Sequence, residues 1–78
     1  MAQFEHITTN PAVLGGKPVI RGSRISVEFI LELLGSGASI RDIVQVYSHL
    51  SEEAVREAVA FAAHHLRNDV DYEVRLSA

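Results

Sequence analysis

The chain has 78 residues, no cysteine and a formal net charge of −3. A chain of this length allows one domain, and such a domain is marginally stable alone because it buries a limited fraction of its surface. Disulfides and thiolate metal sites are excluded, which leaves association with another chain as the common means of stabilisation. No signal-peptide pattern begins the sequence, and no apolar run approaches the roughly 18 residues that span a bilayer. We therefore expect a cytoplasmic protein that forms a homodimer.

The charge is divided unevenly along the chain. Residues 1–27 carry Lys17, Arg21 and Arg24 against Glu5, whereas residues 28–78 carry four arginines against nine acids. Any binding of a polyanion would therefore depend on the N-terminal part. The acidic remainder suits a basic partner protein or serves solubility alone.

The N-terminal third predicts an arm over residues 1–12 and a β-hairpin over residues 13–27. The extended stretches 18–21 and 24–27 flank Gly22-Ser23, which fits a two-residue type II′ turn. In that register Arg21 lies opposite Arg24, and both arginines share one face because side chains alternate along a strand.

Three helices are predicted over residues 27–34, 40–47 and 52–66. Each follows a serine that suits the N-cap, namely Ser26, Ser39 and Ser51. Apolar residues recur in each at helical spacing. The resulting fold is mostly α, a single domain over 1–78 whose three-helix, helix-turn-helix-like core occupies residues 27–66.

The tail over residues 67–78 predicts a short strand. Residues 70–76 alternate between apolar and charged, with Tyr72, Val74 and Leu76 on one face. Such a strand needs an edge to pair with, either in the protein's own N-terminal strands or in a partner.

One combination of motifs resembles a known family. The run Gly-Gly-Lys-Pro-Val-Ile-Arg-Gly-Ser-Arg-Ile-Ser-Val (15–27) is followed by Ile-Leu-Glu-Leu-Leu (30–34) and Tyr-Ser-His-Leu-Ser (47–51). Together they resemble the domain-of-unknown-function family four-three-three (DUF433), small prokaryotic proteins often described as VapB-type antitoxins. The resemblance covers roughly residues 7–66. It departs from the family at Ser48, where proline is usual, and at Ser23, where threonine is commoner.

The resemblance implies a helix-turn-helix core and a cognate toxin, typically a PIN-like nuclease, as partner. Such antitoxins commonly also bind duplex DNA at their operator. In this reading the tail residues Tyr72, Val74 and Leu76 anchor on the toxin. Arg75 reaches its acidic metal-binding site, since guanidinium pairs with carboxylates.

The arginines opposite each other on the predicted hairpin are candidate nucleic-acid-binding residues together with Lys17. Like charges directly opposite disfavour a hairpin by a few tenths to ~1 kcal/mol, and a bound anion would offset that cost. The alternative is structural, with one arginine paired to Glu28 or Glu32. By contrast, the third helix begins with Glu52 and Glu53, which makes base recognition by this helix unfavourable.

Phe29 and Leu33 lie off the apolar stripe of the first helix, so they belong either to a dimer contact or to the core. The adjacent His64 and His65 point about 100° apart on a helix and do not suit one metal, so solvated histidines are expected throughout. No nucleophile with its base and no phosphate-binding loop is recognisable. We expect no enzyme, no metal and no cofactor.

Two functions from different classes remain open from the sequence. The first is an antitoxin that neutralises a PIN-like ribonuclease by protein binding, with or without operator DNA binding. The second is a stand-alone helix-turn-helix DNA-binding regulator. A purely structural subunit is a third, weaker interpretation.

Overall fold

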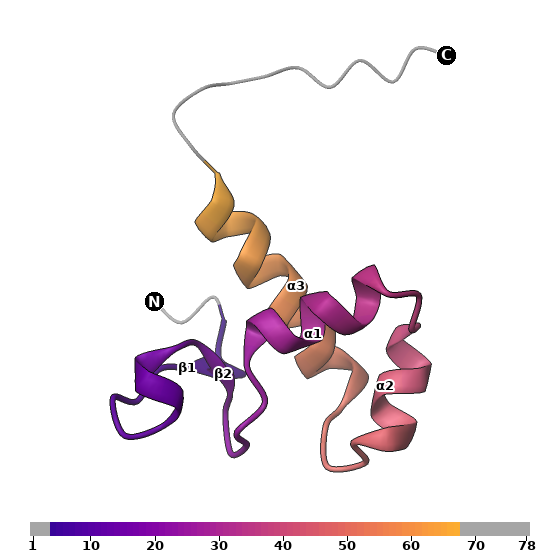
Figure 1. The fold of residues 1–78 in the computed structure, drawn as a ribbon, viewed down its shortest axis with the longest axis horizontal. Helices are drawn as coiled ribbons and strands as arrows, with labels where there is room; N and C mark the ends of the chain where they lie inside the picture. Colours follow the sequence, from indigo (N-terminus) through magenta and orange to yellow (C-terminus); the bar gives the residue numbers. More distant parts are fainter. Residues whose placement is uncertain (1–3, 68–78) are drawn as a thin grey trace.

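The computed structural model describes residues 4–67, which form three helices and a small two-stranded sheet (Figure 1). Helix α1 spans Val27–Gly35, α2 spans Ile40–Val46 and α3 spans Glu52–Leu66. The predicted mostly α fold with an N-terminal hairpin is confirmed, although the hairpin pairs residues 7–8 with 19–20 and thus includes part of the predicted arm. Among the helices of this part of the chain, none is long and apolar enough to cross a membrane. The predicted tail strand lies outside the described residues.

Each helix starts where its serine accepts a hydrogen bond from a backbone N–H of the first turn. The hydroxyl oxygens of Ser26, Ser39 and Ser51 accept from the amides of residues 29, 42 and 54. At α2 the Asp42 carboxylate also accepts from the Ser39 backbone N–H at 2.9 Å, which completes a capping box. These bonds satisfy orphan donors of the first turn and fix three helix starts that local sequence predicts correctly.

The strand pairing differs from the predicted hairpin. Strand β1, Ile7–Thr8, lies in the predicted arm and pairs antiparallel with β2, Val19–Ile20. Residues 9–18 connect them through a short 3-10 turn, Leu14–Gly16. Of the predicted pairing, the structure keeps one bridge, between Val19 and Ser26. It also keeps two backbone hydrogen bonds of 2.9 Å, from the Ile20 N–H to the Ile25 carbonyl and from the Val27 N–H to the Pro18 carbonyl. These contacts keep the predicted register, but residues 24–26 form no strand of their own and the chain enters helix α1 at Val27.

The turn after β2 also differs from the expected type II′ turn. The Ser23 backbone N–H donates to the Ile20 carbonyl at 3.0 Å, so the turn spans residues 20–23 and Gly22 is its third residue, at φ +82°. The Ser23 hydroxyl donates to the same carbonyl at 2.7 Å and accepts from the Ile25 N–H at 3.0 Å. Because Arg21 is inside this turn, it does not form the cross-strand pair with Arg24 that the predicted hairpin required.

The core lies where α3 crosses α1 and α2. Ile30, Ile43, Val55 and Ala58 are almost completely buried there. Small side chains on α3, Ala54, Ala58 and Ala62, allow the helices to approach closely. Strand β1 contacts the same helix from the other side. The C-terminal half of α3 reaches beyond this packed body (Figure 1), and side chains near that end remain accessible.

Candidate partner-binding site

Lys17 forms an ion pair with Glu28. Its Nζ lies 2.7 Å from the Glu28 carboxylate, and both side chains are well exposed. The hydrogen bond with Lys17 lowers the pKa of Glu28, and the same bond raises the pKa of Lys17. The structural alternative expected an arginine to pair with Glu28 or Glu32, but within residues 4–67 Glu28 pairs with the lysine instead. This pair links the segment just before β2 to the first turn of α1.

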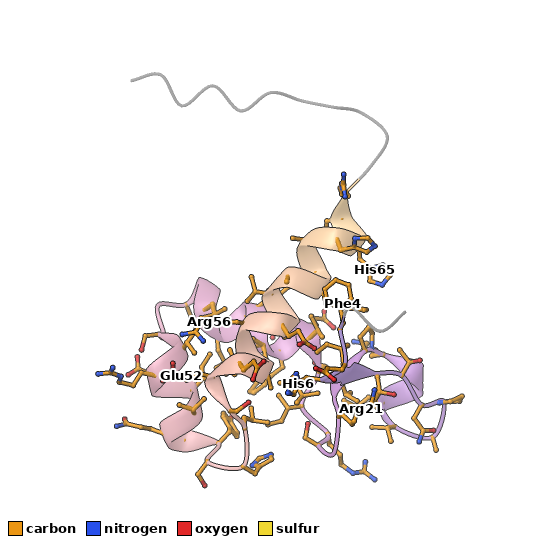
Figure 2. All side chains as sticks on the ribbon, turned by 180° about the vertical axis from the view of Figure 1, so that it is seen from behind. Phe4, His6, Arg21, Glu52, Arg56 and His65 are labelled. Carbon is orange, nitrogen blue, oxygen red and sulfur yellow. The ribbon has the colours of Figure 1, made fainter. Side chains whose placement is uncertain are left out.

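Arg21 is held against the N-terminal segment. Its Nε donates to the Glu5 carbonyl oxygen at 2.8 Å, and its backbone N–H donates to the His6 carbonyl at 2.7 Å. Figure 2 shows Arg21 on the strand side of the molecule, away from Glu52 and Arg56 on α3. Two of the three predicted nucleic-acid-binding residues thus have partners within the domain.

Arg24 is the third, and it borders an open groove. The groove has a volume of about 700 Å³. It lies between residues 22–25, the residues around β1 and the connection from α2 to α3. We call it the turn groove. Within residues 4–67 the exposed Arg24 side chain has no hydrogen-bond or ion-pair partner. The residues that line the groove together with Arg24 include Asn10, Val13, Val19, Ile25, Tyr47 and His49.

A second groove lies between α1 and the C-terminal half of α3. It has a volume of about 280 Å³, and we call it the α1–α3 groove. Its lining is largely aliphatic and aromatic and includes Val27, Leu31, Phe61, Ala62 and Leu66. Leu66 is 75% exposed. Apolar surface in a concave position is typical of a protein-binding site.

Phe29 and Leu33 have different environments. Leu33 is half-buried and packs on the core, as expected if it belongs to the core and not to a dimer contact. Phe29 is 36% exposed and places its ring edge-to-face with Tyr47, with the ring centroids 5.9 Å apart. A dimer contact through this helix would therefore involve Phe29 more than Leu33.

Sequence reasoning missed the contact between His6 and Glu57. The His6 backbone N–H donates to Glu57 Oε1 at 2.6 Å, and its ring Nδ1 lies 2.9 Å from Oε2. The hydrogen bond with Glu57 raises the pKa of His6, and the same bond lowers the pKa of Glu57. The expectation of a solvated His6 is wrong. No local motif joins residues 51 positions apart, so sequence pattern alone offered no signal.

The other histidines lie near aromatic rings or solvent. His65 packs edge-to-face on Phe61, with the ring centroids 4.3 Å apart. The Phe4 ring contacts both Phe61 and His64, at centroid distances of 5.4 and 5.6 Å. Within residues 4–67 no three histidine, aspartate or glutamate side chains are grouped closely enough to hold a metal ion.

The exposed start of α3 is acidic. Glu52 pairs with Arg56 at 3.1 Å one turn later, and Glu53 is exposed beside it. This helix occupies the recognition position of a helix-turn-helix. Its carboxylates would face phosphates there, which disfavours insertion of this end into a DNA groove.

The fold and its grooves define a small three-helix domain with an N-terminal hairpin and concave apolar surface. Its sequence matches the family described as "Protein of unknown function (DUF433)" over residues 7–62. The chain belongs to this family.

Two relatives illustrate the similarity. An uncharacterized protein, y4eO, from Sinorhizobium fredii (strain NBRC 101917 / NGR234) is 33% identical over 61 residues, which cover 78% of this chain and 28% of that protein. The chain therefore spans under a third of that relative's length. The crystal structure of a DUF433 member protein from Anabaena variabilis ATCC 29413 superposes with a TM-score of 0.73 at 27% identity, over 76% of this chain and 58% of that one.

Proposed function

We propose that the protein is the antitoxin of a type II toxin–antitoxin pair, which neutralises a PIN-like ribonuclease by binding it, with or without additional binding of its operator DNA. The observation that carries the protein-binding part is the α1–α3 groove, where Leu66 and the neighbouring apolar side chains remain accessible on a very small body. Exposed apolar surface in a concave position commonly marks a site at which another protein binds. The antitoxin assignment itself follows the family resemblance.

The tail completes this proposal. Tyr72, Val74 and Leu76 would anchor on the toxin, and Arg75 would compete for the carboxylates of its metal site. These residues lie outside the described part of the chain. Their role is a prediction that deletion of residues 69–78 tests directly.

Co-expression with the neighbouring gene product tests the proposal. The toxin alone should arrest growth, and co-expression of this chain should restore growth and allow co-purification. Leu66→Glu should reduce co-purification by placing a charge in the α1–α3 groove, whereas Val46→Glu, at a similarly exposed position on α2 (72% against 75%), should not. Equal effects of both variants, or growth restored without any complex, would contradict the proposal.

The alternative is a stand-alone DNA-binding regulator, which the helix-turn-helix-like order of the helices favours. If DNA binds, we expect the basic turn to lead because α3 begins with carboxylates. Replacement of Arg24 by alanine should then weaken binding to a labelled duplex from the protein's own promoter, measured by fluorescence anisotropy. It should leave Tm nearly unchanged, because the Arg24 side chain has no partner within residues 4–67. A lower Tm with unchanged DNA affinity would assign Arg24 to the fold.

A further inference from the structure

The turn groove combines an apolar interior with a cation at its edge. Val19 is 2% exposed and Ile25 is half-buried, so these side chains form its deeper surface. The half-buried Tyr47 adds an aromatic ring, while Arg24 and His49 are exposed at the entrance. A volume of about 700 Å³ falls in the range typical of ligand sites, roughly 300–1,000 Å³.

Arg24 differs from the other two basic residues of its segment. Lys17 is paired with Glu28, and Arg21 donates to a backbone carbonyl. Arg24 has no such partner within residues 4–67, and its guanidinium carries donors whose fork geometry matches a carboxylate. The apolar interior would receive a neighbouring hydrophobic side chain, and the Tyr47 ring offers an aromatic contact.

We propose that the turn groove binds a segment of a partner protein in which an Asp or Glu lies next to an aromatic residue. The carboxylate pairs with Arg24, and the aromatic side chain enters between Val19, Ile25 and Tyr47. This inference rests on the proposed protein-binding function and names a second contact surface for it, distinct from the α1–α3 groove.

A nucleic-acid phosphate fits the turn groove less well. Phosphate recognition in this setting depends on several cations along a surface, and Arg24 is the one cation among the described lining residues that is charged at every physiological pH. A phosphate would also leave the apolar interior empty.

Two matched peptides test the proposal by NMR titration of the full-length, ¹⁵N-labelled protein. N-acetyl-Asp-Phe-amide and N-acetyl-Asn-Phe-amide have nearly the same shape, but only the first carries a side-chain carboxylate. We expect the acidic peptide to bind about fivefold more tightly, as for an exposed ion pair. Shifted resonances should include Val19, Ile25 and Tyr47. Arg24→Gln should abolish the preference for Asp over Asn, and Arg24→Lys should restore part of it.

Arg41→Gln is the control, because Arg41 is exposed on α2 outside the groove, and it should leave the preference intact. Equal binding of the two peptides, shifts confined to other surfaces, or displacement of the acidic peptide by inorganic phosphate or a thymidine dinucleotide at equal concentration would overturn the proposal. A negative peptide result with toxin co-purification retained in Arg24→Gln would reject this contact and leave the antitoxin function standing.

Discussion

At the scale of single residues, His6 and Glu57 make the most specific polar contact in the described part of the chain. One carboxylate accepts from a backbone N–H and meets a ring nitrogen of the same histidine. The Glu57 side chain is 17% exposed, so its charge is partly shielded from water. The contact holds the N-terminal segment against the middle of α3, and it does so most strongly when His6 is protonated and Glu57 is ionised.

This contact predicts a pH dependence of stability. The pKa of His6 is raised above its ordinary value of 6.5 by Glu57, so its contribution is complete below pH 6.5 and is lost as pH rises through the raised value. The pKa of Glu57 is lowered from 4.5, so its contribution is complete above pH 4.5 and is lost as pH falls through the lowered value. The pair therefore stabilises the fold most between pH 4.5 and 6.5.

We expect His6→Ala to lower Tm chiefly within that window and to converge on the wild-type curve at alkaline pH. Thermal unfolding followed by circular dichroism across pH 4 to 9 would measure this, with His49→Ala as the exposed-histidine control. A Tm difference that does not change with pH would show that the imidazole acts by packing alone.

At the scale of elements, helix boundaries were predictable because each depends on neighbouring residues. Ser39 with Asp42 forms a capping box from positions three apart. Strands β1 and β2 have two residues each, too few for alternation to give a signal, and their pairing depends on contacts with α3. For the turn groove, the sequence identified the basic segment but not which of its cations would be unpaired. That depends on Glu28 and the Glu5 carbonyl, which bind Lys17 and Arg21 in the folded chain.

The turn and the first helix supply a matched pair of glycine substitutions. A Cβ at Gly22 or at Gly35 would meet no atom within 4 Å, but Gly22 has φ +82° whereas Gly35 is helical. Gly22→Ala should therefore destabilise the protein by about 1–2 kcal/mol from backbone strain. Gly35→Ala should stabilise it by up to about 1 kcal/mol.

Urea unfolding of both variants gives these free energies directly. If Gly35→Ala destabilised the protein as much as Gly22→Ala, the loss of stability would have a cause other than the positive φ at Gly22.

At the scale of the whole molecule, the described body has little interior for its surface. Fully buried large side chains are few, and several apolar side chains are accessible, among them Phe29, Val46 and Leu66. Stability of such a domain is commonly increased by association.

We expect the protein to be at least dimeric at micromolar concentration, through a contact that includes Phe29. In sedimentation equilibrium, the Phe29→Ser dimer should dissociate at a protein concentration about tenfold higher than that at which the wild-type dimer dissociates. Val59→Ser is the control, because Val59 on α3 has the same 36% exposure. A wild-type monomer throughout this range would assign Phe29 to its contact with Tyr47 only.

The contact between the N-terminal segment and α3 also determines the order in which the domain is completed on the ribosome. Residues 4–8 are synthesised well before α3, yet Phe4 packs on Phe61 and His6 binds Glu57. Strand β1 can pair with β2 early, but Phe4 and His6 find their partners on α3 only after the last of the described helices has been made. A nascent chain interrupted before α3 would leave Phe4 and Ile7 exposed, so truncated products should be targets for chaperones and proteases and should not accumulate as folded fragments.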